Sequence, residues 1–132
     1  NALNEASLHI DGDGSEKLDF TFIDDLVDGV CLAISKPAAR NEIFNMTYGA
    51  SRSILELAEI VRGHFEDVEF EHVERDHLMP FRGTLSVDKA QRLLGYAPKR
   101  PLEVGMAKYV DWYRDIWSVG MSPGREPTRA AR

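Results

Sequence analysis

Little in the sequence suits an oxidising compartment, a membrane or nucleic acid. The single cysteine, Cys31, excludes an internal disulfide and suits a reducing compartment. No apolar run approaches the roughly 18 residues of a membrane span. The net charge of −6 argues against general nucleic-acid binding, which needs a basic surface. We therefore expect a cytoplasmic protein whose partners include neither nucleic acid nor a membrane.

What is present is enough for one globular domain. The 132 residues are 43% hydrophobic and 29% charged, a composition typical of proteins with a packed core. Residues 1–117 carry the regular patterns, whereas residues 118–132 lack periodicity and are predicted to form a disordered tail. The chain begins at Asn1 with NALNEAS, which reads like the end of a helix, so we expect a piece of a longer protein.

The stretch HIDGDGSEKLDF alternates acidic residues with glycine, as calcium loops do. An EF-hand loop needs glycine at its sixth position and glutamate at its twelfth. Counted from Asp11, the sixth residue is glutamate and the twelfth is phenylalanine. Counted from His9, the glycine falls correctly but phenylalanine closes the loop. Because neither register supplies the closing carboxylate, we predict a turn and not a metal site.

Both sides of this turn alternate apolar and polar residues. Such a period of two is typical of a strand with one buried face. The apolar positions are Leu8 and Ile10 before the turn, and Leu18, Phe20 and Phe22 after it. Since aspartate and glycine tolerate a left-handed backbone, the whole segment from Leu8 to Phe22 is predicted to be a β-hairpin.

A helix is predicted at Asp24–Ser35, where apolar residues recur at helical spacing before Pro37. Asp24 or Asp25 is expected to cap its first turn, in preference to acid or base catalysis, because carboxylates accept hydrogen bonds from free backbone N–H groups there. Cys31 lies in the apolar stripe of this helix, which predicts a buried thiol.

The remaining patterns complete an α/β arrangement. Ser53 and Glu56 have the spacing of a capping box, which predicts that a helix begins after Ser53. The other predicted elements are strands at 42–48 and 67–73, a loop at 74–83, and helices between Ser86 and Gly95 and at 102–117. None of the four histidines has metal-ligand spacing, so no metal is expected.

Three segments, taken in order, resemble a known family: GDGSEKLDFTFIDDLVDGVCLAI, NEIFNMTYGASRSILELAEIV and KAQRLLGYAPKRPLEVGMAKYVDWYRD. Together they are similar to the C-terminal, substrate-binding part of extended short-chain dehydrogenases/reductases, the NAD-dependent nucleotide-sugar epimerases and dehydratases such as UDP-glucose 4-epimerase-like enzymes. The resemblance runs from Leu8 to Asp115. It implies the last helix and strand of a Rossmann fold plus a small mixed α/β substrate-binding lobe, with the N-terminal Rossmann core missing.

The resemblance also implies where a nucleotide sugar would bind. In the family the glycine-rich hairpin borders that site, and the following strand carries Arg-Asp-Phe, whose arginine contacts the diphosphate. Here the matching residues are Leu18, Asp19 and Phe20, so the arginine is missing. A second phosphate-binding arginine belongs to the loop before the Lys-Ala helix, where two candidates stand. The implied substrate-binding residues are therefore Lys17, Phe20, Arg75 and Arg82.

The family's NAD-binding and catalytic motifs are absent from this sequence. Its NAD site uses a glycine-rich turn between a strand and a helix, and its catalytic base is a tyrosine four residues before a lysine. Tyr48 is followed at that spacing by Arg52, which cannot be assumed to replace lysine. We therefore expect no catalytic or cofactor-binding residue here, NAD only in a full-length parent enzyme, and no activity of this chain alone.

Two further expectations follow. If the strand at 42–48 lacks a sheet neighbour, its exposed edge invites pairing with a second copy, which predicts a possible homodimer. The alternative to an enzyme fragment is a stand-alone, non-catalytic module that binds nucleotide sugars or another protein.

Overall fold

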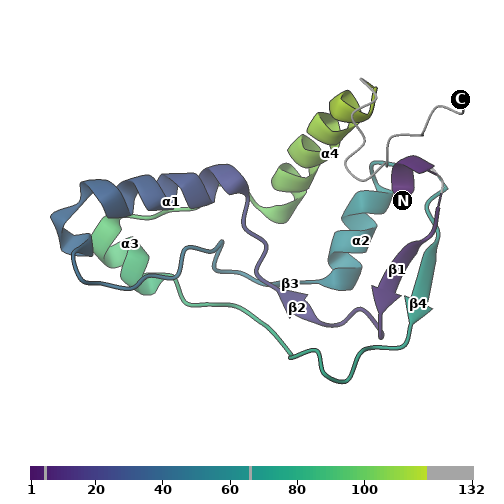
Figure 1. Cartoon of the computed structure of the whole chain (residues 1–132), viewed down its shortest axis with the longest axis horizontal. Coiled ribbons are helices and arrows are strands. Elements are labelled where there is room, and N and C mark those ends of the chain that lie inside the picture. The colour runs from purple at the N-terminus through teal and green to yellow at the C-terminus, as the bar shows by residue number, and fades with distance from the viewer. Residues whose placement is uncertain (5, 66, 119–132) are drawn as a thin grey trace, which may run out of the picture.

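The computed structural model describes residues 1–4, 6–65 and 67–118. In chain order the elements are η1 (Ala2–Asn4), β1 (Leu8–Asp11), β2 (Lys17–Leu18), α1 (Ile23–Ser35), η2 (Pro37–Ala39), β3 (Arg52–Ser53), α2 (Ile54–Arg62), β4 (Phe70–Val73), α3 (Asp88–Leu94) and α4 (Leu102–Ser118). Figure 1 shows an elongated molecule with α1 and α3 at one end, α2, β1 and β4 at the other, and α4 between them. The predicted α/β class is confirmed. The predicted tail lies outside the described residues, except for Ser118 at the end of α4.

The strands pair differently from the predicted hairpin. β1 lies parallel to β4, in a register that opposes Leu8 to Phe70, and β2 lies antiparallel to β3. The prediction that β1 and β2 pair with each other is therefore wrong. The backbone amide of Gly12 donates to the carbonyl of Val73, so β1 continues its ladder with β4 and does not turn back on itself. Alternation shows that a strand has one buried face, but it does not name the partner strand.

The helices begin and end close to where their sequences predicted. At α2, the Ser53 hydroxyl accepts from the Glu56 amide while the Glu56 carboxylate accepts from the Ser53 amide, so the predicted capping box is confirmed. α3 ends at Gly95, whose φ of 65° lies in the left-handed region that favours glycine. At α1 the cap prediction is wrong: the N-cap position is Phe22, and its side chain makes no capping hydrogen bond.

The predicted strand at 42–48 is also wrong, because no strand occurs there in the described structure. This segment is instead tied down by side chains. The Asn45 side-chain amide donates to the Ser86 carbonyl over 3.0 Å, and the Tyr96 hydroxyl donates to the Thr47 carbonyl over 3.0 Å. The segment is therefore held at intervals by long-range hydrogen bonds and not by a strand ladder.

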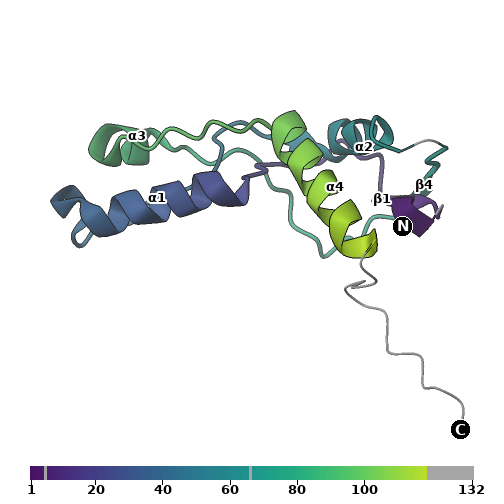
Figure 2. The same ribbon diagram turned by 90° about the horizontal axis from the view of Figure 1, so that it is seen from above.

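The best-packed core lies between α1 and α3. The buried residues Val87, Ala90 and Tyr96 form a cluster against which Leu32, Phe44 and Met46 pack. Gly29 lets α1 approach this cluster closely, because a Cβ on Gly29 would lie 2.8 Å from the Met46 sulfur and 3.0 Å from the Tyr96 ring. Figure 2 shows the resulting side-by-side arrangement of α1 and α3.

The opposite face of α1 is not covered by the described residues. Ile23, Val27, Val30 and Ile34 follow one another at helical spacing and are all exposed. We call these four residues the α1 stripe. Cys31, next to it, is exposed as well, so the prediction of a buried thiol is wrong. The amphipathic pattern was real, but the side that it marked as apolar faces outward. No helix in the described part of the chain is long and apolar enough to cross a membrane.

Candidate functional site

A partly buried carboxylate joins three segments that are distant in sequence. Asp19, directly after β2, accepts hydrogen bonds from the backbone amide of Gly49 at 3.1 and 3.2 Å and from that of Leu85 at 3.4 Å. Gly49 has a φ of 83°, and a Cβ there would lie 2.9 Å from Val87. Only glycine therefore fits this junction. This role of Asp19 could not be predicted from the sequence, because both of its partners lie at least 30 positions away.

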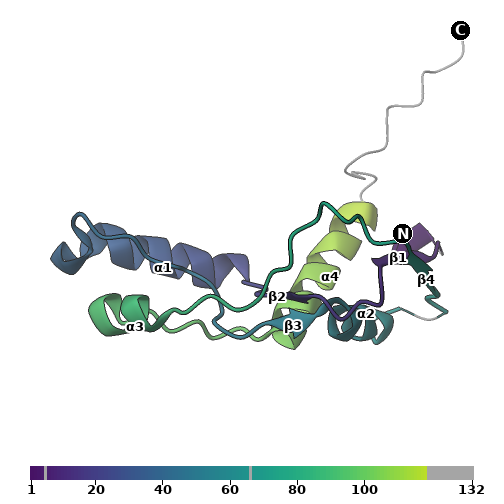
Figure 3. The ribbon, with the colours of Figure 1, turned by 90° about the horizontal axis from the view of Figure 1, so that it is seen from below.

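Two hydroxyl groups reinforce the same junction. Thr21 accepts a hydrogen bond from the Tyr48 amide at 3.1 Å, and Thr84 accepts one from the Ser51 amide at 2.9 Å. The segment from β4 to α3 runs along the length of the molecule and passes β2 and β3, as Figure 3 shows. These contacts hold the segment that carries Phe20 beside the segment that follows the arginine loop, residues 74–83.

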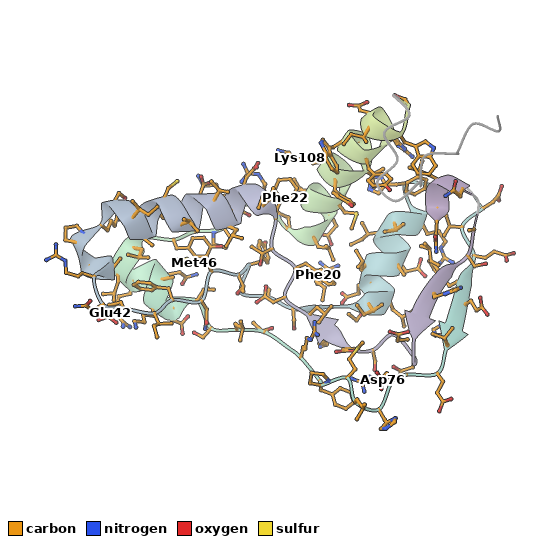
Figure 4. All side chains as sticks on the ribbon, in the orientation of Figure 1. Phe20, Phe22, Glu42, Met46, Asp76 and Lys108 are labelled. Atoms are coloured by element: carbon orange, nitrogen blue, oxygen red, sulfur yellow. The ribbon has the colours of Figure 1, made fainter. Side chains whose placement is uncertain are left out.

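Phe20, the residue after Asp19, lines an apolar groove. The groove has a volume of about 570 Å³ and lies between residues 20–23 and α4. Its walls include Phe22, Leu102, Tyr109 and Trp112, and its rim carries Arg100 and Lys108. Figure 4 shows Lys108 beside Phe22, and the Lys108 ammonium lies 5.7 Å from the centre of the Phe22 ring. The groove is therefore mostly apolar, with two cations at its edge.

Arg75 lies in the arginine loop and packs against the glycine-rich turn. One guanidinium nitrogen donates to the Met79 carbonyl at 2.7 Å and lies 3.7 Å from the Glu16 carboxylate. The guanidinium also stacks over the Phe81 ring, with 4.2 Å between its carbon and the ring centre. A Cβ at Gly12 would lie 3.3 Å from the Arg75 Cβ, so the turn passes close to the arginine. The buried Nε of Arg75 has no hydrogen-bond partner among the described residues.

The other two basic candidates are exposed. Lys17 lies on β2, where its backbone pairs in register with Ser53. Arg82 lies at the far end of the arginine loop. No hydrogen bond or ion pair of the described residues joins Lys17 or Arg82 to Phe20 or Arg75. The structure thus places Arg75 at the turn that precedes Lys17, and Phe20 in the groove against α4.

The most buried charge among the described residues is Asp25, whose partner the sequence did not indicate. Asp25 is only 1% exposed, and its carboxylate accepts from the Arg100 amide at 2.9 Å and from the Arg100 guanidinium at 2.7 Å. Burial by itself would raise the pKa of Asp25, but hydrogen bonds from the backbone of Arg100 and Lys99 and from the Arg100 side chain outweigh it and lower that pKa. Arg100 also lies 3.1 Å from Asp24. The two aspartates therefore fix the start of α1 to the segment before α4.

The described residues do not fit the pyrophosphate of a dinucleotide. Such a group needs free backbone N–H groups at a helix N-terminus behind a glycine-rich turn. The first turns of α1, α2 and α4 each carry acidic residues, and the capping box at Ser53 already uses free N–H groups of α2. The Tyr96 hydroxyl is no substitute for a catalytic base, because burial and then the nearby aspartate charges raise its pKa. No group of three or more His, Cys, Asp or Glu residues within the described ranges could hold a metal ion.

Known proteins of similar sequence and structure are epimerases. No family model matches the chain. Over 107 residues it is 33% identical to a UDP-glucose 4-epimerase of Mycolicibacterium smegmatis, an alignment that covers 79% of this chain and 33% of that protein.

Two solved structures share the fold. An epimerase of Methanothermobacter thermautotrophicus superposes with a TM-score of 0.85 at 31% identity, covering 89% of this chain and 36% of that one. A UDP-glucuronic acid 4-epimerase of Bacillus cereus, in complex with UDP-glucuronic acid and NAD, superposes with a TM-score of 0.80 at 25% identity, covering 86% and 37%. The chain spans about a third of the length of the relatives it matches.

Proposed function

We propose that residues 1–117 of this chain supply one wall of a nucleotide-sugar pocket. The chain belongs to the extended short-chain dehydrogenase/reductase epimerases. The observation that carries this proposal is the likeness to the Bacillus cereus enzyme, which binds UDP-glucuronic acid and NAD and shares the fold over 86% of this chain. The arginine loop adds support, because its cations can meet the two phosphates of such a substrate. Lys17 and Phe20 belong to the same proposed wall.

The redox part of epimerisation is proposed to lie outside this chain. The described residues do not fit NAD, and none of their tyrosines has the lysine partner that the family's base requires. We infer that the whole protein is an NAD-dependent epimerase or dehydratase to which this chain contributes substrate contacts, and that the chain alone turns over no substrate. A cytoplasmic setting is part of the same proposal and rests on the single, exposed cysteine.

The test is a titration of the full chain with UDP and UDP-glucose, followed by two-dimensional amide NMR and calorimetry. We expect saturable binding, with shifts confined to the glycine-rich turn, residues 17–20 and the arginine loop, and no turnover of UDP-glucose when NAD is added. Arg82→Ala is expected to weaken binding about tenfold, since it removes one charge-assisted contact to phosphate. Arg92→Ala, an exposed arginine on α3, is the matched control and should bind as the unaltered chain does. Absence of saturable binding at millimolar UDP contradicts the proposal.

The alternative of a stand-alone interaction module is favoured by one observation, the exposed α1 stripe. Monomeric proteins rarely expose extended apolar patches that have no partner. Ile43 in the 42–48 segment is 87% exposed and adds to the apolar surface. We therefore also infer that the chain self-associates through apolar surface that includes the α1 stripe and Ile43. Under this alternative, UDP leaves the NMR spectrum unchanged while sedimentation still shows association.

A further inference from the structure

The arginine loop is organised around the side chain of one of its own residues. Arg75 donates through Nη1 to the Asp76 carbonyl at 3.3 Å and through Nη2 to the Met79 carbonyl at 2.7 Å, and it stacks on Phe81. Because these partners follow Arg75 by one, four and six positions, the loop folds back over the guanidinium. Two amides of the loop are themselves bonded to Asp76: that of Leu78 to its carboxylate and that of Met79 to its carbonyl.

The same side chain connects the loop to the glycine-rich turn. The Glu16 carboxylate, whose side chain is 13% exposed, lies 3.7 Å from the Arg75 guanidinium. Gly12 allows the close approach, since any larger residue would press against the Arg75 Cβ at 3.3 Å. The glycine-rich turn is itself fixed to β4. The Gly12 amide donates to the Val73 carbonyl, and the His72 ring lies 2.8 Å from the Gly12 carbonyl. Arg75 thus joins the loop to a part of the fold that is itself held in place.

These contacts make Arg75 a poor ligand for a diphosphate. Its side chain is 21% exposed, and its charge already faces a carboxylate in a poorly hydrated position. A phosphate-binding arginine presents its planar fork to the ligand, which Arg75 cannot do without giving up Met79, Glu16 or Phe81. Arg82 is exposed, and no ion pair links it to a carboxylate of the described residues.

We propose that Arg75 is a positioning residue, which holds the arginine loop against the glycine-rich turn so that Arg82 can contact the diphosphate of a nucleotide sugar. The part that concerns Arg82 rests on the proposed function, whereas the part that concerns the loop does not. Glu16 is the counter-ion of Arg75 and keeps its guanidinium against the glycine-rich turn. The roles of the two arginines, which the sequence left open, are thereby separated.

The experiment uses the full chain with the variants Arg75→Ala, Arg75→Lys, Arg82→Ala and Glu16→Gln, and Arg92→Ala as the control. Hydrogen exchange at the Leu78 and Met79 amides reports loop order without any ligand. We expect exchange there to be about tenfold faster in Arg75→Ala and unchanged in Arg82→Ala. Arg75→Lys should restore little, because lysine lacks the planar fork that spans two carbonyls and stacks on a ring. Glu16→Gln keeps the shape but removes the ion pair, and should speed exchange more modestly.

UDP affinity, measured at several salt concentrations, then separates positioning from contact. Arg82→Ala should lower affinity and flatten its dependence on salt, since a screened charge contact to phosphate is lost. Arg75→Ala should lower affinity several-fold with the salt dependence preserved. Unchanged exchange in both Arg75 variants, or a flattened salt dependence in Arg75→Ala, overturns the proposal. If the unaltered chain binds no UDP, the proposed function fails while the exchange data still decide the role of Arg75; if Arg75→Ala does not fold, Glu16→Gln and Arg75→Lys decide it.

Discussion

Helices α1 and α2 have equally clear amphipathic sequences but very different surroundings. α2 begins in a capping box, and its inner face contacts β1 and α4. Arg52, just before it, pairs with Glu56 at 2.8 Å and with Glu103 of α4 at 2.7 Å, so the helix is tied to its neighbour at its first turn. Pattern and environment agree in α2, which is the simple case.

In α1 the pattern and the environment disagree. Its buried positions within the described structure are a carboxylate and a glycine, Asp25 and Gly29, while the α1 stripe is exposed. The helix is therefore held by an ion pair to Arg100, by close packing at Gly29 and by Leu32, and not by the α1 stripe. Periodicity tells which side of a helix is apolar, but only the tertiary structure tells what covers that side.

Among substitutions that test the difference between α1 and α2, Asp25→Ala is expected to lower the free energy of unfolding most. The substitution removes the buried acceptor of the Arg100 amide and of one guanidinium nitrogen, so the free energy of unfolding should fall by about 3–5 kcal/mol. Urea unfolding followed by circular dichroism measures it. Asp24→Ala is the matched control, because that carboxylate is half exposed and should cost at most about 1 kcal/mol. Equal losses for the two variants would show that α1 is not anchored through Asp25.

The same pair predicts a dependence on pH. The pKa of Asp25 is lower in the folded chain than its ordinary value, so the ionised carboxylate stabilises the fold. Its contribution is fully present above the pKa of the unfolded state and is lost as pH falls through the folded pKa. The stability difference between the unaltered chain and Asp25→Asn should therefore be constant near neutral pH and shrink in acid. A difference that grows in acid would contradict the assignment.

A medium effect is expected at α2 from Ser53→Ala. Removing the hydroxyl leaves the Glu56 amide without its cap, which typically costs about 1 kcal/mol. Ser35→Ala at the end of α1 is the control, because its hydroxyl makes only a long bond of 3.3 Å to the Leu32 carbonyl and should cost less than about 0.5 kcal/mol. Thermal unfolding of both variants measures the difference. Equal costs would mean that the capping box contributes nothing to the stability of α2.

Local features of the fold could be predicted from the sequence, whereas long-range contacts could not. The capping box at Ser53 and the end of α3 at Gly95 were predictable, since each depends on residues within one or two helical turns. The pairing of β1 with β4 was not, because 62 positions separate the partners and alternation carries no information about register between them.

The candidate site divides in the same way. The resemblance, which local motifs carried, implied the arginine loop and Phe20 as candidate substrate contacts. It could not tell Arg75 from Arg82, because Glu16 lies far away in the sequence. The sequence favours a helix cap for Asp25 for the same reason: its partner, Arg100, follows 75 positions later. Long-range ion pairs therefore separate residues that local patterns leave equivalent.

The smallest effect on stability, and the sharpest test of the comparison, is expected from Ile34→Lys. Ile34 ends the α1 stripe and is 82% exposed, so the substitution should change the free energy of unfolding by less than about 0.5 kcal/mol. Self-association, in contrast, should fall clearly, because a charge would have to be buried at the contact. Sedimentation over a range of concentrations should show an average mass that rises for the unaltered chain and rises much less for this variant.

Ile43→Lys is the matched substitution, since Ile43 is 87% exposed but lies outside the α1 stripe. A smaller decrease in association is expected there, because one isolated side chain contributes less apolar area than a stripe of four. If Ile43→Lys disperses the chain and Ile34→Lys does not, the contact runs along the 42–48 segment and the α1 stripe is not what a second copy covers. A clean monomer of the unaltered chain at high concentration would contradict self-association altogether, both through the α1 stripe and through the 42–48 segment.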